Sequence, residues 1–535
     1  MDVENWLKSK QYSDELLAAA RAVLEEVRRG EETIQAIRRH PLPDGGHIAK
    51  HVLVAAYRGL VESGEWEKDP ALLAKIRMKP VRTLSGVTTV TVLTKPAACP
   101  GECIFCPEDV RMPKSYLPDE PGAARAFQNQ FDPYLQVYTR LESYHAVGHP
   151  TDKIELLILG GTWSAYPWDY QEWFVRRCFD AMNRVESETL AEAHQRNETA
   201  PHRNVGLVIE TRPDEINPLE LKWLRRLGVT KVQMGVQSLD DHILELNRRG
   251  HTVQQALEAV ALLRAAGFKI VLHWMPNLLG ATRESDREDF ARLWQEARDG
   301  WGFCPDEIKI YPTQLLEGTM LYHHWRNGEY HPYSTEELVK LIADLKPTIP
   351  EYCRVNRIIR DIPSTHVVAG NKRTSLRQDV LVELTRRGQR CRCIRCREVR
   401  DQKISTEDLE LRDIVYHPQA AEEHFLQFVT PEDRIAGYLR LSLPKPDAPA
   451  TGIEELTGAA LVREVHVYGQ SLRVGEEAPG AAQHVGLGSQ LLQKAEELAR
   501  AAGFRRLAVI AAVGTRRYYA ARGFYKGELY MLKDI

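Results

Sequence analysis

The segment VTTVTVLTKPAACPGECIFC, residues 87–106, joins a run rich in β-branched residues to three closely spaced cysteines, Cys99, Cys103 and Cys106. β-Branched residues favour strands, so the first part of this segment predicts a strand that ends just before the cysteines. Five further short apolar runs follow along the chain, and helical patterns separate most of them. The six predicted strands are Val87–Leu93, Ile154–Leu159, Val205–Ile209, Lys231–Met234, Lys269–Leu272 and Glu307–Ile310.

This alternation of strands and helices predicts an α/β fold with a parallel sheet. Six such units indicate an incomplete (β/α)6 barrel of the TIM type, related to the eight-fold barrel. The clearest helix is Thr252–Ala266, where apolar residues recur at helical spacing up to Gly267, a residue that favours a helix end. In barrels of this kind the chemistry lies at the carboxyl ends of the strands.

Polar and glycine residues follow the strands at those carboxyl ends. The cysteines come after the first strand, and further signals lie at or just after the second, third, fourth and sixth strands. They are Gly160, Gly161 and Thr162, then Glu210 and Arg212, then Gln237, then Lys309. We expect these residues to form a pocket with the cysteines, although each one taken singly could be an ordinary turn or surface residue.

The chain divides into four predicted regions. Residues 1–75 carry helical periodicity and predict a small helical region, and residues 76–370 hold the barrel. Residues 371–401 form a basic, cysteine-rich linker, and residues 402–535 predict a second α/β domain. A length of 535 residues is too great for one ordinary core, which agrees with several domains.

Composition indicates a multidomain globular protein rather than a membrane or secreted protein. The hydrophobic fraction is 43% and the charged fraction 27%, and no apolar run is long enough to span a bilayer. The N-terminus has no signal-peptide pattern, so we expect a cytoplasmic protein and no membrane partner. Six of the nine cysteines fall into two short clusters, which favours metal binding over disulfides in a reducing compartment.

The net charge of −3 is unevenly distributed. Residues 371–400 contain ten Lys or Arg against three Asp or Glu, and a second basic group, Lys75, Arg77, Lys79 and Arg82, precedes the first strand. Such clusters suit phosphate binding. The alternative is a solvated charged surface without a ligand.

Cys99, Cys103 and Cys106 can bind three irons of a four-iron cluster and leave the fourth iron open to an exogenous ligand. In S-adenosylmethionine (SAM) chemistry that ligand is the amino acid end of the cofactor, and one electron then yields a 5′-deoxyadenosyl radical. The alternative is zinc, which usually takes four protein ligands at a structural site. With Phe105 before the third cysteine, the segment resembles the C-x3-C-x2-C motif of the radical SAM superfamily. That resemblance implies that Gly160 and Gly161 contact the SAM amino group.

A glycine-rich helix start, Gln483-His484-Val485-Gly486-Leu487-Gly488, lies between predicted strands Arg463–Val467 and Leu507–Ala511. Closely approaching backbone N–H groups and the helix dipole suit a pyrophosphate. The loop resembles that of the GNAT acetyltransferases, and the segment from Tyr518 to Tyr525 resembles the GNAT tyrosine segment, in which a tyrosine hydroxyl lies near the CoA sulfur. Tyr518 and Tyr519 are the candidates, and the alternative for either is a core position.

Together the two domains resemble the family of Elongator catalytic subunits and their stand-alone bacterial and archaeal homologues. The likeness includes Glu210-Thr-Arg-Pro-Asp214 and Arg463-Glu-Val-His-Val-Tyr-Gly469. It implies a tRNA carboxymethyluridine synthase, in which the radical abstracts hydrogen from the acetyl methyl of acetyl-CoA and the carbon radical adds to C5 of the wobble uridine.

The family resemblance also assigns residues to this reaction. Acetyl-CoA would contact Glu464, Val465, His466, Val467, Gln483, His484, Val485, Gly486 and Gly488, with Tyr518, Tyr519 and Lys153 as catalytic candidates. The tRNA anticodon stem-loop would contact Lys75, Arg77, Lys79, Arg82, Arg357, Arg360, Lys372 and Arg373. The reaction requires an electron donor, and we also expect that the chain can form a homodimer.

The second cysteine cluster, Cys391-Arg-Cys393-Ile-Arg-Cys396, predicts a structural zinc in the linker. The sequence identifies no fourth ligand, and Cys304, Cys353 and several histidines are candidates. A set of free thiols is the alternative.

Two other functions compete with the radical one. The chain could acetylate protein lysines, with the barrel serving only to bind RNA, or it could be a tRNA-binding scaffold without activity. The first predicts acetyl transfer without SAM or reductant, and the second is disfavoured by intact motifs in both domains.

Overall fold

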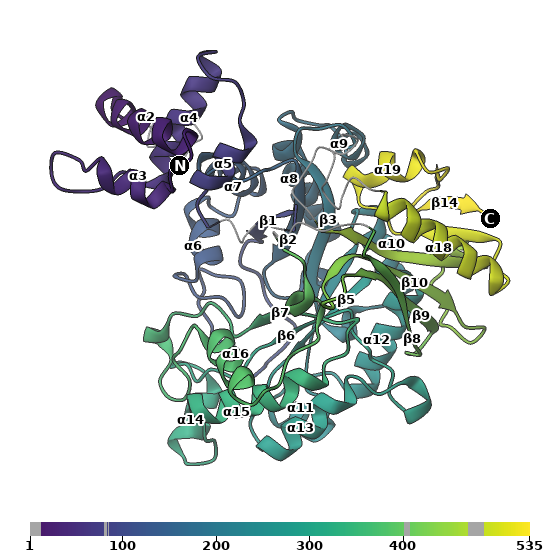
Figure 1. Cartoon of the computed structure of the whole chain (residues 1–535). Coiled ribbons are helices and arrows are strands. Elements are labelled where there is room, and N and C mark those ends of the chain that lie inside the picture. The colour runs from purple at the N-terminus through teal and green to yellow at the C-terminus, as the bar shows by residue number, and fades with distance from the viewer. Residues whose placement is uncertain (1–11, 80–82, 84, 401–406, 469–485) are drawn as a thin grey trace.

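The computed structural model describes residues 12–79, 83, 85–400, 407–468 and 486–535. These residues form a small helical bundle and two seven-stranded sheets, which Figure 1 shows packed side by side. Four residues singled out in the sequence lie outside the described residues: Arg82, Gln483, His484 and Val485. Within the described part of the chain, no helix is both long and apolar enough to cross a membrane.

The first sheet is parallel throughout, and its strands follow one another in sequence order from β1 to β7. β1 and β7 form its two edges, so the barrel is open. The strands are β1 Thr88–Leu93, β2 Lys153–Leu159, β3 Arg203–Thr211, β4 Lys231–Gln237, β5 Lys269–Trp274, β6 Glu307–Ile310 and β7 Arg354–Ile358. All six predicted strands are confirmed, with ends that differ by a few residues.

The seventh strand, β7, is the element that the sequence pattern does not indicate. Only Val355 and Ile358 are buried apolar residues in it. Arg354, Asn356 and Arg357 line the interior cavity instead. A strand with charged residues on its inner side lacks the apolar run by which the other six strands are recognised.

Helices cover the outer face of the half-barrel, as Figure 1 shows. They are α6 Pro121–Gln128, α7 Pro133–Ala146, α8 Trp168–Asn183, α9 Leu190–Asn197, α10 Pro218–Arg226, α11 Asp241–Leu246, α12 Val253–Ala265, α13 Arg283–Arg292, α14 Met320–Arg326, α15 Thr335–Leu345, α16 Leu376–Arg386 and α17 Ile394–Arg397. The predicted helix at residues 252–266 is confirmed as α12. Thr252 and Gln255 form a capping box that fixes its start.

The second sheet has the order β13-β14-β12-β11-β10-β9-β8. Its elements are β8 Glu410–Tyr416, β9 Ala421–Val429, β10 Ile435–Pro444, β11 Ala459–Val467, β12 Arg506–Val509, β13 Tyr525–Lys526, β14 Met531–Asp534, α18 Leu487–Ala501 and α19 Arg516–Ala520. β11 and β12 are parallel, and the other neighbours are antiparallel. β12 pairs only with residues 459–462 of β11, so the two strands diverge beyond Val462.

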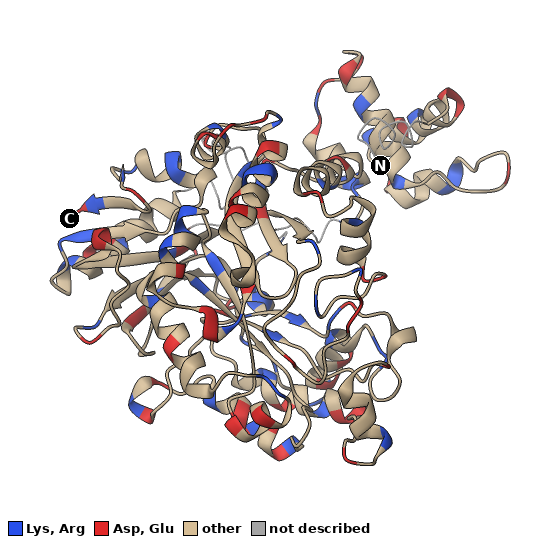
Figure 2. Cartoon of the chain, turned by 180° about the vertical axis from the view of Figure 1, so that it is seen from behind, with Lys and Arg blue, Asp and Glu red and all other residues tan. Residues whose placement is uncertain are grey.

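The N-terminal helices form a separate bundle with its own apolar core. They are α2 Asp14–Arg28, α3 Thr33–Arg39, α4 Lys50–Glu62 and α5 Pro70–Ile76. The bundle lies at one end of the molecule, next to α6 and α7 (Figure 1). Acidic and basic residues are interspersed on it and on the other helices (Figure 2).

The two sheets share one hydrophobic core, which runs from Val90 to Leu532. Their contact also contains charged side chains that are almost fully buried. Arg463 of β11 donates to both carboxylate oxygens of Asp306, which precedes β6, at 2.6 and 2.8 Å. Arg440 of β10 donates to the backbone carbonyls of Asp306 and Tyr352. These contacts fix the second domain firmly against the half-barrel.

Candidate functional site

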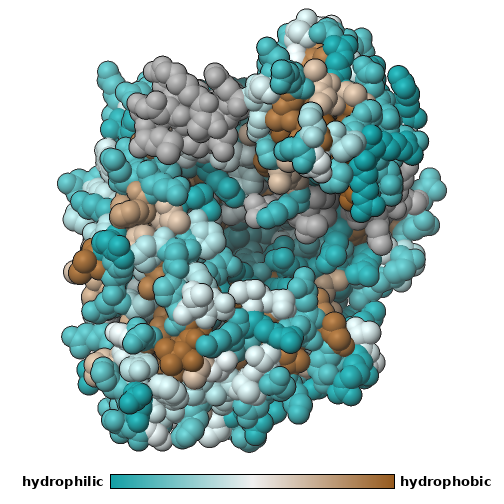
Figure 3. All heavy atoms as spheres, turned by 90° about the vertical axis from the view of Figure 1, so that its left-hand side faces the viewer, coloured by the Kyte–Doolittle hydropathy of each residue, from teal (hydrophilic) through white to brown (hydrophobic). Residues whose placement is uncertain are grey.

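One cavity of about 970 Å³ joins the cysteine loop to the second domain. Its walls include the three cysteines at one end, inward-facing residues of the half-barrel, and residues of β10 and β11 at the other end. A space-filling view from the side shows the surface hollowed near its centre, with mostly hydrophilic residues around the hollow (Figure 3). The cysteine loop and the β11 residues Glu464, Val465 and His466, which belong to two separate sequence motifs, therefore line the same space.

Cys99, Cys103 and Cys106 all line this cavity, in the loop that follows β1. Arg249 donates from Nη1 to the Cys103 sulfur at 3.3 Å. A hydrogen bond with Cys106, together with the Arg249 guanidinium, lowers the pKa of Cys103 to about 5. A thiolate at neutral pH is the form that binds metal.

The spacing of the cysteines separates the two metal hypotheses for this loop. A tetrahedral zinc with Zn–S bonds of 2.3 Å places its sulfurs about 3.8 Å apart. Among the described residues, the linker triad is the only group of three or more ligand atoms that all lie within 4.8 Å of one another. At least one pair of loop sulfurs is therefore farther apart than a single zinc ion would hold it, although Cys103 and Cys106 share a hydrogen bond.

Unpaired polar atoms beside the cysteines indicate a missing polar ligand. Arg212 Nη1 and Gln237 Oε1 are buried and have no hydrogen-bond partner, and both residues line the cavity. Buried polar atoms normally have hydrogen-bond partners, so a bound polar molecule would supply the partners of these two atoms. Gly101 leaves the room that this requires, because a Cβ there would lie 2.2 Å from Arg212 Nη1. These residues fit a SAM-sized polar ligand next to a cluster.

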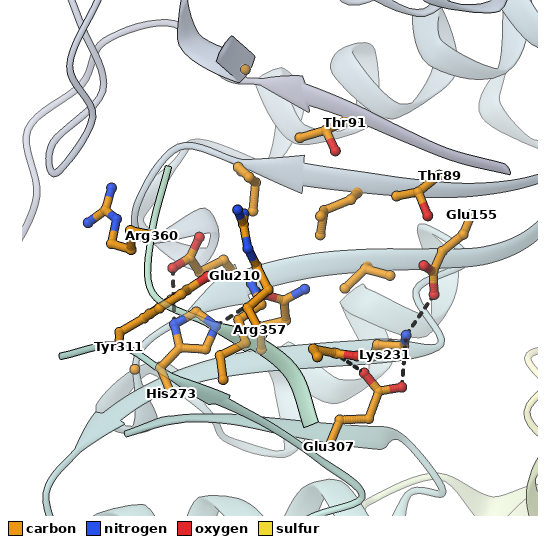
Figure 4. A pocket seen from close by; sticks show the side chains of 18 of the residues that line it. Thr89, Thr91, Glu155, Glu210, Lys231, His273, Glu307, Tyr311, Arg357 and Arg360 are labelled. Atoms are coloured by element: carbon orange, nitrogen blue, oxygen red, sulfur yellow. Dashed lines mark hydrogen bonds and ion pairs between the residues drawn. The ribbon is translucent and has the colours of Figure 1, made fainter. Parts of the chain in front are cut away.

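Further inside, β3 to β6 contribute a hydrogen-bonded group that includes two of the predicted residues, Glu210 and Lys309. Lys309 Nζ and His273 Nε2 both contact Gln233 Oε1. His273 Nδ1 lies 3.5 Å from Glu210, as Figure 4 shows. Burial lowers the pKa of His273 well below its usual value, so the imidazole is neutral.

At the amino ends of the strands, five charged residues form a continuous series that we call the charge ladder: Glu155, Lys231, Glu307, Lys269 and Glu464. Lys231 lies 2.6 Å from Glu155 and 3.2 Å from Glu307, as the dashed lines of Figure 4 show. Lys269 lies 3.7 Å from Glu307 and also pairs with Glu464 of β11. All five line the cavity. The ladder thus crosses from the half-barrel into the second domain.

The electrostatics of the ladder keep its carboxylates charged. Burial raises the pKa of Glu307, but the ammonium groups of Lys231 and Lys269 outweigh this and lower it to about 2. The same balance, with Lys269 and Arg440 as partners, lowers the pKa of Glu464. Glu464 also accepts hydrogen bonds from Tyr438 at 2.8 Å and Arg440 at 3.0 Å. Its carboxylate is therefore a domain-to-domain anchor.

In the second domain, Glu464, Val465 and His466 line the cavity where β11 diverges from β12. The His466 Nε2 atom is buried without a partner. Burial lowers the pKa of His466 to about 4, so its ring is neutral. Tyr519 also lines the cavity, and burial raises its pKa, which keeps the hydroxyl protonated. A thioester placed at this divergence would meet both groups.

Gly488 and Tyr518 lie next to each other at the start of α18. A Cβ on Gly488 would lie 2.4 Å from the Tyr518 hydroxyl, so only glycine allows this approach. Gly486 has a φ of +74° and is the N-cap of α18, and a helix N-terminus is a site type that suits an anion. Arg522 stacks 3.6 Å over the Tyr518 ring and donates to Ser489.

Some predicted residues are not part of the cavity wall. Among the described residues these are Lys153, Gly160, Val467, Gly486, Gly488 and Tyr518. Lys153 begins β2, in register with Arg203. Gly160 follows β2 with a φ of +140°, and a Cβ there would lie 1.8 Å from Thr94 Oγ1. Gly161 and Thr162, the next two residues, do line the cavity.

The predicted tRNA contacts fall into two groups. Arg357 and Arg360 line the cavity, and Arg360 also donates to Ser115 and Glu120. Lys75, Lys79, Lys372 and Arg373 are exposed, whereas Arg77 is half-buried and donates to the Gly148 carbonyl at 2.8 Å. The exposed group is available to phosphates.

The linker triad is a compact group of thiols. Cys391, Cys393 and Cys396 offer sulfurs within 4.8 Å of one another, close to the spacing of about 3.8 Å that zinc imposes. Neither Cys304 nor Cys353 belongs to this group of described residues. The three thiols fit a zinc site as part of its donor set.

Several residues at the site are not indicated by the sequence motifs. Arg249, Gln233, His273, Lys231 and Lys269 lie on or near strands β4 and β5. Lys231, Gln233, Gly235 and Gln237 alternate along β4 and all line the cavity. That period of two is the signal that could have found them, because alternate strand residues share one face.

Family models match most of the chain. A model described as the radical SAM superfamily matches residues 94–293, and one described as a radical SAM C-terminal domain matches residues 305–386. A model of the acetyltransferase (GNAT) family matches residues 395–526.

Relatives with both domains are similar along nearly the whole chain. A tRNA uridine(34) acetyltransferase of Dehalococcoides mccartyi is 44% identical over 85% of this chain and 99% of its own length. Elongator complex protein 3 of Homo sapiens is 36% identical over 87% of both chains. The solved structure of Methanocaldococcus infernus Elp3 lacking its first 46 residues is 36% identical, with a TM-score of 0.72 over 84% of this chain and 99% of that one.

Proposed function

Because the chain belongs to the family of tRNA uridine(34) acetyltransferases and Elongator complex protein 3, we propose that it modifies the wobble uridine of tRNA. The proposed reaction joins the methyl carbon of acetyl-CoA to C5 of the base by SAM-dependent radical chemistry. The methyl hydrogen leaves on 5′-deoxyadenosine, C5 loses its hydrogen as a proton, and the adduct returns the electron that cleaved SAM. Hydrolysis of the thioester then leaves 5-carboxymethyluridine.

The observation that carries this proposal is the single cavity shared by the two domains. A carbon radical must be formed and consumed before water or another group quenches it. The cysteine loop, the barrel interior and the divergence between β11 and β12 enclose one space. A lysine acetyltransferase with an inert barrel would have no need for that connection.

Cys99, Cys103 and Cys106 would hold the cluster, which when bound supplies the electron that cleaves SAM to a 5′-deoxyadenosyl radical. Gly160, Gly161 and Thr162 would form the backbone cradle for the methionine end. Arg212 and Gln237 would supply the donor and acceptor that now lack partners. Glu210 and Lys309 complete the proposed SAM pocket.

For acetyl-CoA, Gly486 and Gly488 would admit the pyrophosphate to the start of α18. Glu464, Val465, His466 and Val467 would lie along the pantetheine. Tyr518 and Tyr519 are proposed to hold the thioester end, where protonated hydroxyls can donate to its carbonyl oxygen. Lys153 stays a proposed catalytic residue that would reach the substrate from β2.

Neutral His466 is suited to the final hydrolysis. Its Nε2 is buried and lacks a partner, and the residue lines the cavity at the end where the thioester is expected. A neutral imidazole can accept a proton from water that attacks the thioester carbonyl. The water proton passes to Nε2, the C–S bond breaks and CoA leaves as the thiol.

The exposed basic residues Lys75, Lys79, Lys372 and Arg373 are proposed to contact tRNA phosphates, which position the stem-loop. Single-stranded loop nucleotides can be splayed out into a protein pocket, so the wobble base can enter the cavity near Arg357. Cys391, Cys393 and Cys396 are proposed to hold a structural zinc in the linker.

The test is an anaerobic assay of the reconstituted protein with reductant, SAM, acetyl-CoA and unmodified tRNA, followed by mass spectrometry of the nucleosides. We expect 5-carboxymethyluridine at position 34, and none with Cys103→Ala or when SAM is omitted. The proposal fails if iron-sulfur-loaded protein forms no modified uridine. Acetylated protein lysines formed without SAM or reductant would instead support the lysine acetyltransferase alternative.

A further inference from the structure

We propose that the interior of the half-barrel is the channel through which the acetylated pantetheine arm reaches the radical site, entering from the amino ends of the strands. The inference rests on the proposed function and adds the route to it. In barrel enzymes the amino ends of the strands serve stability and the interior is packed. Here the cavity continues through the interior to that end.

The distance between the two ends of the barrel strands is too long for the reaction to occur across it. Hydrogen abstraction requires reacting atoms about 3–3.5 Å apart. β4 has 7 residues and is therefore about 20 Å long. Lys231 at its start belongs to the charge ladder that touches the second domain, whereas Gln237 at its end lies near the cysteines. A thioester held at the second domain must therefore advance into the barrel to react.

Buried contacts hold the second domain in one position relative to the half-barrel, so the thioester cannot reach the radical site by a movement of that domain. Arg463 and Asp306 form their paired hydrogen bonds with both side chains 0% exposed. Arg440, which is 1% exposed, holds two backbone carbonyls of the half-barrel. The divergence between β11 and β12 is thereby fixed over the amino ends of the barrel strands.

Small polar side chains line the interior of the half-barrel on β1. On β1, Thr89 and Thr91 line the cavity, and Figure 4 shows both side chains pointing into it. Thr89 is in register with Glu155 and Thr91 with Leu157 of β2. These small and polar side chains leave open the space that branched apolar residues fill in a packed barrel. The pantetheine arm carries amides, which suit polar walls.

The ion pair between Lys269 and Glu464 marks the entrance of this channel. It joins the first residue of β5 to β11. Its two charges lie in the cavity wall, between the divergence of β11 and the barrel interior. The thioester passes this pair, moves past Thr89 and Thr91, and places its methyl group next to the SAM pocket.

The first experiment blocks the channel with Thr91→Phe. Reconstituted enzyme is given SAM, reductant, tRNA and acetyl-CoA deuterated in its methyl group, and deuterium in 5′-deoxyadenosine is measured. We expect deuterium transfer to fall by about a hundredfold, as for reacting atoms displaced by about 1 Å. SAM cleavage and acetyl-CoA binding should persist. Thr385→Phe, at an exposed position of α16, is the matched control and should transfer deuterium like the wild type.

The second experiment detects the arm directly and does not depend on catalysis. Thr91→Cys with the cluster in place is treated with CoA activated as its 2-pyridyl disulfide. Exchange forms a disulfide between Cys and CoA and releases pyridine-2-thione, so no other oxidant is needed. Peptide mass spectrometry should show much more CoA adduct at position 91 than a nucleotide-free pyridyl disulfide of cysteamine gives. Thr385→Cys should show no such preference.

The outcomes separate the channel from the proposed function. If the wild type transfers no deuterium from acetyl-CoA, the proposed function is wrong. If the wild type transfers deuterium and Thr91→Phe does so equally well, the channel is wrong and the function stands. Equal labelling of position 91 by both disulfides would likewise overturn the channel, whether or not the phenylalanine variant folds.

Discussion

The substitution Asp306→Asn tests how the two domains are held together. Asp306 is 0% exposed and accepts hydrogen bonds from Arg463 at 2.6 and 2.8 Å and from the Ile270 N–H at 2.9 Å. Arg440 Nη1 lies 3.4 Å away. Asparagine keeps the size of the side chain but removes its charge, and its NH2 group would face a donor. Arg463 and Arg440 would each lose one of two buried carboxylate partners and keep Glu423 and Glu464, respectively.

The loss in the free energy of unfolding follows from the burial of the Arg463–Asp306 ion pair. Removal of one partner of a buried ion pair costs about 3–5 kcal/mol, because the other charge stays buried. At about 2–4 °C per kcal/mol for a large domain, the melting temperature should fall by about 6–20 °C. Differential scanning fluorimetry measures this fall. tRNA modification should also decline more than SAM cleavage, because the second domain loses its fixed position over the barrel.

Asp299→Asn is the matched control, because the Asp299 side chain is 52% exposed. Exposed ion pairs contribute little, so its melting temperature should equal that of the wild type. If Asp306→Asn also melts at the wild-type temperature, the buried pairs do not hold the domains. If it melts lower but keeps its ratio of tRNA modification to SAM cleavage, domain position does not control the reaction.

The remaining predictions concern pH, the CoA loop and the linker. Burial raises the pKa of Asp306, but its arginine partners outweigh burial and lower the pKa. The ionised carboxylate therefore contributes to stability above the ordinary pKa of about 3.9, and this contribution is lost as pH falls below that value. Between pH 6 and pH 3 the melting temperature should fall more steeply for the wild type than for Asp306→Asn. Gly488→Ala should weaken acetyl-CoA binding, measured by calorimetry, by about tenfold, because the new methyl group meets the Tyr518 hydroxyl. Gly59 has open space around it, so the Gly59→Ala protein should bind acetyl-CoA as the wild type does. Cys393→Ser should lose bound zinc by elemental analysis and keep its iron; zinc retained at the wild-type amount would contradict the linker site.

Local patterns in the sequence determine much of this protein. The strand before the cysteines, the helix start at Thr252 and the glycines at α18 depend on residues that are close together in the chain. β-Branched runs, capping residues and glycine conformations act over a few residues, so they are visible without a structure. The cysteine spacing and the glycine loop likewise carry their chemistry within a short segment.

The strand β7 and Arg249 show where local patterns fail. Arg354 and Arg357 look like loop residues because their burial depends on a cavity that the whole half-barrel encloses. Arg249 approaches Cys103 across 146 positions of the chain. No short-range signal marks such a contact.

By itself, then, the sequence determined two chemical sites and the kinds of fold that carry them. Only the tertiary structure decided that they share one cavity, and that Glu464 joins Lys269, 195 positions away, to complete the charge ladder. The physical reason is that periodicity and turn chemistry are short-range properties. The placement of one domain over the other depends instead on buried pairs such as Arg463 and Asp306, whose members are far apart in the chain.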